Sequence, residues 1–292
     1  MVLTNPIMGF VYEVPALSQI NHAIVAIGTD TGWIWLDPTV EGSVEWLTPF
    51  ESDKPAIVCT ERGENIIHTP NQPPEANLTE VKTFGELNEN GELKQSIIIQ
   101  GKGTMDMSFR QLFKYVPEEQ FKEMILQSVR AKHGKARIDS IKSGNPDDFT
   151  VPMTLTFYIT IPEYPTIIGD EWHIGGGEAE SFGAGQQGNI FALDERKYPI
   201  ELQIRNANYS ESILYFPKNM SVKTLPEPFS YSGKYISIES SQKVKENSIF
   251  STDKMVFKEH RIPQEEYKNL KEVMENLSNH SKQEIILVIN GK

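Results

Sequence analysis

The amino-acid sequence predicts a mainly β protein with some α-helix, in which an antiparallel sheet is followed by a β-sandwich-like domain with two amphipathic helices. Short apolar runs with a bias toward β-branched residues recur along the chain, and Pro, Gly and Asn turns separate them. Two segments place apolar residues at helical spacing. The 292 residues are enough for two domains of ordinary size, each with its own core.

The N-terminal part is expected to form the antiparallel sheet. Residues 22–28 and 33–36 are apolar runs on either side of the turn residues 30–32, and this pattern predicts a β-hairpin. Residues 55–59 and 65–68, joined by a polar turn, predict another pair of strands. The four strands together would form one sheet.

A domain boundary is expected after this sheet. The stretch TPNQPPEAN, at residues 69–77, concentrates prolines that disfavour both helix and strand pairing. We therefore expect one domain at residues 1–70 and a β-rich domain at residues 71–292.

The second domain begins with a hairpin and continues as short strands. Residues 80–87 and 93–103 alternate apolar with polar side chains, and Asn90-Gly91 between them suits a tight turn. A glycine-rich stretch at 175–188 has the composition of a mobile loop. The further strands are expected at 136–143, 150–161, 190–193, 200–204, 212–215, 221–225, 234–239, 248–259 and 284–289. Repeated short strands of this kind favour a β-sandwich.

Two amphipathic helices are expected in the second domain. One spans residues 117–134, because Pro117 suits a first helical turn and Gly134 suits a helix end. The other begins at Pro263. Their apolar faces are formed by Phe121, Met124, Ile125 and Val129, and by Tyr267, Leu270, Val273, Met274 and Leu277.

Composition excludes several classes of function. The net charge of −12 repels phosphate backbones, and no stripe of Lys and Arg overrides that charge locally, so no nucleic-acid partner is expected. No window is long and apolar enough for a membrane span. The group Asp170, Glu171 and His173 could ligate a metal, but a polar loop is the preferred interpretation. We expect no cofactor and no metal.

The candidate catalytic residues lie on the first hairpin. His22 opens one predicted strand and Asp37 closes the next, so an antiparallel hairpin can place both at the same end of the sheet. In such a pair the carboxylate orients the imidazole, which can then take the proton of a thiol. The single cysteine, Cys59, lies in an apolar run and is interpreted as a buried structural thiol.

The segments NHAIVAI and GWIWLDPT resemble the transglutaminase-like branch of the papain-type cysteine protease superfamily. The resemblance implies a partial transglutaminase-like sheet in which His22 is the general base and Asp37 orients it. In that family the nucleophilic Cys precedes the His and lies at a helix N-terminus. Residues 1–21 contain no Cys, and Cys59 follows Asp37, so the catalytic triad is incomplete.

The resemblance continues into the second domain. The segments RKYPIEL, TLPEPFS and RIPQEEYKNLKEVMENLS are similar to the tail domain of large bacterial transglutaminase-like proteins. The chain is therefore expected to be the C-terminal portion of a multidomain cysteine acyltransferase or peptidase, with a fragmentary or degenerate start at Met1, and to be inactive alone. The full-length form would act on a protein or peptide substrate through a thioester.

An alternative from another class is a non-catalytic β-rich binding or scaffold module at a bacterial surface, which keeps the His-Asp pair only as part of its fold. An export signal lost from upstream would place the protein in the periplasm or at the cell surface; otherwise the cytoplasm is expected. In both interpretations, residues 1–70 form a sheet without its usual helices, so we expect self-association or partial disorder there.

Overall fold

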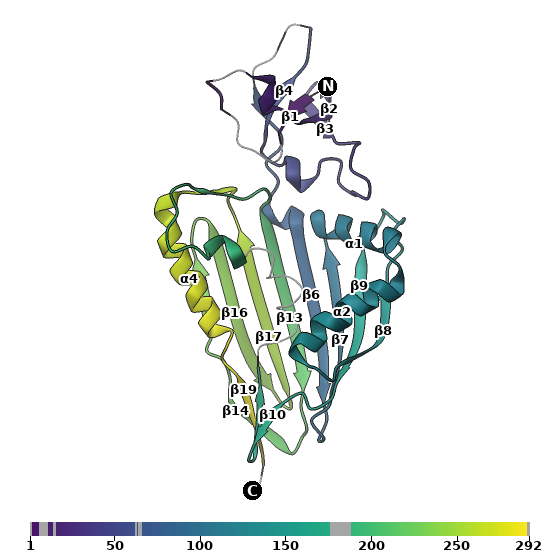
Figure 1. Cartoon of the computed structure of the whole chain (residues 1–292), viewed down its shortest axis with the longest axis vertical. Coiled ribbons are helices and arrows are strands. Elements are labelled where there is room, and N and C mark those ends of the chain that lie inside the picture. Colours follow the sequence, from purple (N-terminus) through teal and green to yellow (C-terminus); the bar gives the residue numbers. More distant parts are fainter. Residues whose placement is uncertain are drawn as a thin grey trace.

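The computed structural model describes residues 2–5, 11–13, 16–61, 63, 66–175 and 188–290, and it confirms a mainly β protein with some helix. A small sheet lies at the N-terminal end of the molecule, and a large sheet with helices on its flanks forms the remainder (Figure 1). Among the described residues, the helices all lack the combination of length and apolar character that crossing a bilayer requires.

The small sheet is antiparallel throughout, with the strand order β3-β2-β1-β4-β5. The predicted hairpin is confirmed, and so is the second predicted strand pair, although its last strand is short. The central strand β1 was not predicted, because three residues are too few to display a period. The bounds are Val2–Thr4 for β1, His22–Thr29 for β2, Gly32–Leu36 for β3, Pro55–Val58 for β4 and Ile67–His68 for β5. Single turns of 3-10 helix lie at Leu17–Gln19 and Pro49–Glu51.

The large sheet has eight strands in the order β15-β16-β17-β13-β6-β7-β9-β8. It is mixed, because β6 and β13 run parallel while the other neighbours are antiparallel. The Asn90-Gly91 turn joins β6 to β7 as predicted, and Gly91 takes the positive φ of 78° that such a turn needs. The strands are β6 (Leu78–Leu87), β7 (Leu93–Gly101), β8 (Arg137–Ser143), β9 (Thr154–Ile161), β13 (Asn206–Tyr215), β15 (Phe229–Ser232), β16 (Ile236–Lys245) and β17 (Ser248–Phe257).

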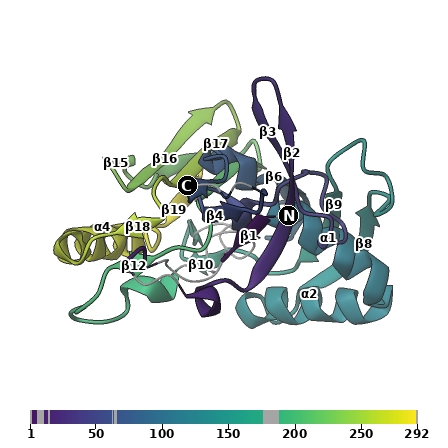
Figure 2. The same ribbon diagram turned by 90° about the horizontal axis from the view of Figure 1, so that it is seen from above.

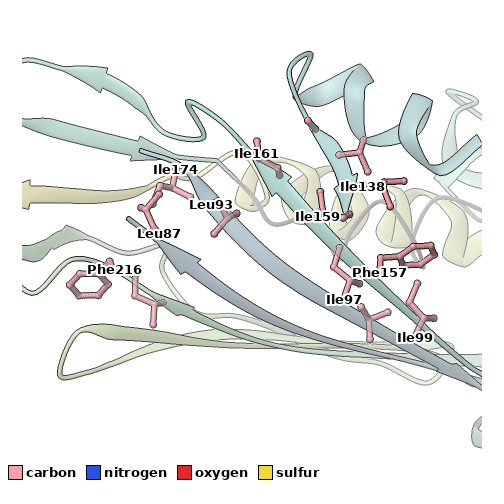
Figure 3. Packing of buried hydrophobic residues seen from close by; sticks show 14 of the residues in the cluster. Leu87, Leu93, Ile97, Ile99, Ile138, Phe157, Ile159, Ile161, Ile174 and Phe216 are labelled. Atoms are coloured by element: carbon pink, nitrogen blue, oxygen red, sulfur yellow. The ribbon is translucent and has the colours of Figure 1, made fainter. Parts of the chain in front are cut away.

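A second sheet packs on one face of the large sheet, as expected for a sandwich-like domain. It has the strand order β10-β11-β19-β14, and its residues Trp172, Ile174 and Leu287 belong to the same buried cluster as Ile97 and Phe157 of the large sheet. Figure 3 shows Ile174 of the second sheet in this cluster together with Ile97 and Phe157 of the large sheet. The strands are β10 (Thr166–Ile168), β11 (Glu171–Ile174), β14 (Met220–Thr224) and β19 (Ile285–Ile289), with a separate pair β12 (Ile200–Glu201) and β18 (Arg261–Ile262).

Both predicted helices are present and pack on the large sheet on one side (Figure 2). They are α2 (Glu118–Lys132) and α4 (Tyr267–His280), and 3-10 turns lie at Pro74–Asn77 and Gln264–Glu266. Helix α1 (Thr104–Tyr115) was not predicted. Its Phe109, Leu112 and Phe113 pack against the core at helical spacing, a signal the sequence analysis missed, and its buried face also includes an ion pair between Asp106 and Arg110, each side chain only 2% exposed.

Several expectations for residues 71–292 were wrong. Residues 190–193 do not form a strand, because Gly188–Phe191 is a 3-10 turn whose Phe191 ring stacks on Tyr267 at 5.9 Å. His173 is not in a loop; it lies in β11, which pairs on both sides. The glycine-rich stretch falls largely outside the described residues, which stop at 175 and resume at 188. A domain boundary at residue 70 stays a prediction.

Side chains of the loop between β3 and β4 contact helix α1 and the residue just before it. The carboxylate of Glu41 accepts a hydrogen bond from the Tyr115 hydroxyl at 2.7 Å and pairs with Lys114. The Glu45 carboxylate accepts one from the backbone N–H of Gly103 at 3.3 Å. These contacts anchor the loop that covers the His22 end of the sheet.

Candidate functional site

The structure brings His22 and Asp37 together at one end of the small sheet. The ring Nε2 of His22 lies 2.9 Å from Oδ2 of Asp37. His22 is the first residue of β2, and Asp37 directly follows β3, so the hairpin ladder that pairs Val25 with Leu36 carries both side chains to the same end. The spatial relationship expected from the sequence is therefore present.

The local sequence around Asp37 determines where its carboxylate points. Strand β3 ends at Leu36, and Pro38 cannot extend the ladder because it has no N–H. The Asp37 carboxylate turns back to accept hydrogen bonds from the Thr39 backbone N–H at 3.0 Å and the Thr39 hydroxyl at 2.7 Å. With Oδ1 held by Thr39, Oδ2 is left to face His22.

Asp37 is kept ionised although its side chain is fully buried. Burial by itself would raise the pKa of Asp37, but the hydrogen bonds from Thr39 and from His22 together outweigh it and hold the pKa below its ordinary value. An ionised carboxylate only accepts hydrogen bonds, so Nε2 of His22 must be the donor. In the neutral imidazole the lone pair then lies on Nδ1.

The Nδ1 atom of His22 is the nitrogen available for chemistry. The described part of the chain provides it with no hydrogen-bond partner, and the His22 side chain is 24% exposed. A neutral imidazole with a bound, ionised carboxylate on one nitrogen and a free lone pair on the other can accept a proton from a nucleophile placed at Nδ1.

Glu51 is a third acidic group at this site, and the sequence analysis did not single it out. Its Oε1 lies 3.9 Å from Nε2 of His22, and its other carboxylate oxygen accepts a hydrogen bond from the Thr48 hydroxyl. Burial raises the pKa of Glu51, the Thr48 hydrogen bond opposes that effect, and the negative charge of Asp37 reinforces it. The spacing T-P-F-E, typical of a capping box, is the sequence signal that could have identified this pair.

His22, Asp37 and Glu51 also present ligand atoms that lie within 4.8 Å of one another, a grouping that could hold a metal ion. The tautomer argues against a metal at Nε2, because that nitrogen cannot donate its proton to Asp37 and bind a cation with the same orbital. A metal there would require loss of the 2.9 Å hydrogen bond.

The interpretation of Cys59 as a buried thiol was wrong: Cys59 is exposed, just past the end of β4. The register also separates it from His22. His22 and Ala56 both pair with Thr4 of β1, so Cys59 lies three residues further along β4 than the level of His22, about 10 Å at about 3.3 Å per residue. Two strand spacings add to that separation, so Cys59 is not the nucleophile at Nδ1.

Comparison with known proteins identifies one family match. Residues 180–287 match DUF3858, a domain of unknown function with a solved structure. The match covers just over a third of the chain, from before β12 to the first residues of β19, and His22 and Asp37 lie outside it. No curated protein matches the chain.

Among solved structures, the chain is similar to one from Parabacteroides distasonis that is described as a candidate protease. The TM-score is 0.43 and the identity is 10%, with 94% of this chain and 37% of that chain covered. The chain thus spans 37% of the length of that protein.

Proposed function

We propose that this chain carries the base and orienting half of a thiol-dependent acyl-transfer or peptidase site, of the transglutaminase-like kind, whose nucleophile comes from a segment outside this sequence. The observation that carries the proposal is the 2.9 Å contact between His22 Nε2 and the ionised Asp37, which leaves Nδ1 with a lone pair facing away from the carboxylate.

The chemistry follows from that geometry. The thiol proton moves to Nδ1 of His22, and the thiolate attacks the carbonyl carbon of an amide in a protein or peptide substrate. The tetrahedral intermediate collapses to a thioester while the Nδ1 proton leaves with the amine. Water or a second amine then attacks the thioester, with His22 as its base, and regenerates the thiol. Asp37 stabilises the imidazolium that forms twice in this cycle.

The hairpin has an exposed apolar face, opposite the face that carries His22, which fits contact with another segment. Val25, Ile27 and Ile34 are 37%, 49% and 39% exposed and share the face of the β2–β3 hairpin opposite the buried Ile24 and Trp35. The hairpin projects from the body of the molecule (Figure 2). An exposed apolar face of this kind is typical of an interaction surface.

The test is an extended reading frame that adds an upstream Cys-bearing segment, assayed for amide hydrolysis that a thiol-alkylating reagent blocks. His22→Ala should lower the rate at least about 100-fold, as expected for loss of a general base. His68→Ala is the matched control, because His68 pairs with Asp53 at 2.8 Å in the same sheet but outside the site. Cys59→Ser should also leave the rate unchanged. Activity that is indifferent to His22 would refute the proposal.

The position of Cys59 favours a second candidate, a non-catalytic binding module. The only thiol of the chain is exposed and remote from Nδ1. A module of this kind would bind its partner equally well with His22→Ala, and no added thiol would produce turnover. The same extended reading frame therefore distinguishes the two candidates.

A further inference from the structure

A polar cavity lies far from His22, between the large sheet, the second sheet and the C-terminal end of α4. Its volume is about 150 Å³. Strands β6, β7, β13, β16 and β17 form its floor, and Leu277 and His280 of α4 close one side. The walls also include Ile174 and Ile285 from the second sheet. The cavity separates the apolar core under α2 from the one under α4.

The floor is polar where the same face of the sheet is otherwise apolar. One row across the strands consists of the paired residues Ser240, Asp253 and Ser210, and the next row consists of Gln242, Ser251, Ser212 and Thr83. On the same face, β7 and β9 carry Ile97, Ile99, Leu155 and Phe157, all buried. Polar residues concentrated at the inward positions of neighbouring strands indicate a purpose other than packing.

Three polar atoms at this cavity have no hydrogen-bond partner although they are buried. They are Oγ1 of Thr83, Nε2 of Gln95 and Oε1 of Gln242. Thr83 is 8% exposed and Gln95 is 7% exposed. Each unsatisfied buried group destabilises a fold by about 1–3 kcal/mol, so three around one void indicate that a molecule in the void satisfies them.

Other groups at the cavity are already held in place. The Ser240 hydroxyl donates to Oδ1 of Asp253 at 2.6 Å, and Nε2 of His280 lies 3.2 Å from the same hydroxyl oxygen. Ser240 is 7% exposed. Within the described part of the chain, Oδ2 of Asp253 receives no hydrogen bond and remains free to accept one from a ligand.

The lining determines the class of ligand. No Lys or Arg is among the described residues that line the cavity, and its one histidine, His280, already contacts the Ser240 hydroxyl beside the one acidic residue, Asp253, so the lining disfavours a phosphate or carboxylate. The unsatisfied atoms include a hydrogen-bond donor and acceptors, so the ligand must offer both kinds of group. A ligand hydroxyl can donate and accept, so it suits either orientation of each Gln side-chain amide. Leu93, Leu214 and Leu277 offer apolar walls for a carbon skeleton.

We infer that this cavity binds a small, neutral, polyhydroxylated molecule of the size of a single sugar unit. The volume is about tenfold the roughly 10–15 Å³ that a cavity needs to hold one water, which leaves room for one ring with its hydroxyls. Gln95, Gln242 and Thr83 hydrogen-bond the hydroxyls from the floor, and the free oxygen of Asp253 accepts from one more. The site is independent of the His22 pair, and most of its residues lie within the segment that matches DUF3858.

The test is calorimetric titration of the full chain with D-ribose, D-glucose and N-acetyl-D-glucosamine, with sodium phosphate as the charged comparison. At least one sugar should bind saturably at millimolar concentrations and phosphate should not. Thr83→Val, which removes the unsatisfied hydroxyl without changing the shape, should weaken sugar binding about tenfold, equivalent to about 1.4 kcal/mol. Without sugar the same variant should be at least as stable as the parent, because the buried hydroxyl has no partner to lose.

Thr252→Val is the matched control, because Thr252 lies on the opposite face of β17, bonded to Ser241 at 3.0 Å, and should not affect binding. The inference is overturned if none of the three sugars binds, if phosphate binds instead, or if Thr83→Val binds sugar as the parent does. It is likewise overturned if a high-resolution structure of the sugar-soaked protein shows only ordered waters in the cavity.

Discussion

Nε2 of His22 and Oδ2 of Asp37 are joined at 2.9 Å, while Oδ1 of the same carboxylate is held by Thr39. The carboxylate thus has a defined orientation, and it selects the imidazole tautomer that carries its proton on Nε2. The nitrogen that remains open is Nδ1, which sets the side from which a nucleophile must approach.

Asp37→Asn should reverse that tautomer. Thr39 still needs an acceptor, so the amide oxygen takes the place of Oδ1 and the amide nitrogen faces His22 as a donor. Nε2 must then accept, and the proton moves to Nδ1, which nitrogen-15 spectra of the ring report. We also expect unfolding to become easier by about 1–3 kcal/mol. The ring of His68, bonded to Asp53, should keep its spectrum; a His22 proton that stays on Nε2 would contradict the tautomer assignment.

Glu51→Gln should remove part of the pH dependence of stability. Burial, with help from the charge of Asp37, raises the pKa of Glu51 above its ordinary value of 4.5, so the folded state holds this proton more tightly than the unfolded state. The free energy of unfolding therefore falls as the pH rises from about 4.5 through the folded pKa. The Gln variant avoids that loss and should be as stable as the parent near pH 4 and more stable near pH 8 in urea titrations.

Glu41→Gln is a control, because the pKa of Glu41 is shifted in the opposite direction to that of Glu51. Hydrogen bonds from Lys114 and Tyr115 lower the pKa of Glu41, so its contribution is present at neutral pH and is lost as the pH falls through that pKa. The exposed Glu41 should show a small loss of stability at pH 8 on substitution. A Glu51→Gln variant that is destabilised at pH 8 would show that its carboxylate is needed in the ionised form.

Arg110→Met should destabilise the protein by about 3–5 kcal/mol, because it leaves the buried Asp106 unpaired. Arg110 donates to Asp106 at 2.7 Å and to three backbone carbonyls between residues 146 and 151. The double variant Asp106→Leu with Arg110→Met should lose less than the two single variants added together. The measurement is a double-mutant cycle by chemical unfolding.

The exposed pair of Arg137 and Asp139, 3.3 Å apart, is the comparison for that cycle. Removing it should change the free energy of unfolding by less than about 1 kcal/mol, because water screens both charges. If removing either pair changed the free energy of unfolding by the same amount, the Asp106–Arg110 pair would not be shielded from water as its burial indicates.

Ile27→Lys should weaken self-association of the chain. Ile27 is 49% exposed beside Val25 and Ile34 on the open face of the hairpin, and a charge there opposes the burial of this face against another copy. Light scattering over a concentration series measures the change. Thr29→Lys, at the polar tip of the same hairpin, should have a smaller effect; equal association of all three proteins would place the contact elsewhere.

The local signals in the sequence were sufficient for much of the fold. Helices α2 and α4 have apolar faces at helical spacing, and Asn90-Gly91 marks the β6–β7 turn, so neighbouring residues alone predict them. The His22 and Asp37 pairing was also predictable, because a short hairpin fixes which residues meet at its ends.

Contacts between distant residues decided the rest. Helix α1 buries Asp106, which pairs with Arg110 and accepts a hydrogen bond from the backbone N–H of Met153, and this contact with a residue far along the chain cannot be read from the helix sequence. Its apolar residues at helical spacing, such as Phe109 and Leu112, were a local signal that the sequence analysis missed. Strand β1 forms because its backbone pairs with β2 on one side and with β4 on the other.

By itself, the sequence determined the mainly β class, two of the helices and the pairing of His22 with Asp37, since each depends on residues close together in the chain. Only the tertiary structure decided that Glu51 approaches His22, that Cys59 is exposed and remote, and that polar positions on β6, β13, β16 and β17 meet at one cavity. The physical reason is that burial and hydrogen-bond satisfaction depend on which strands become neighbours, and strand order is set by packing across the whole sheet.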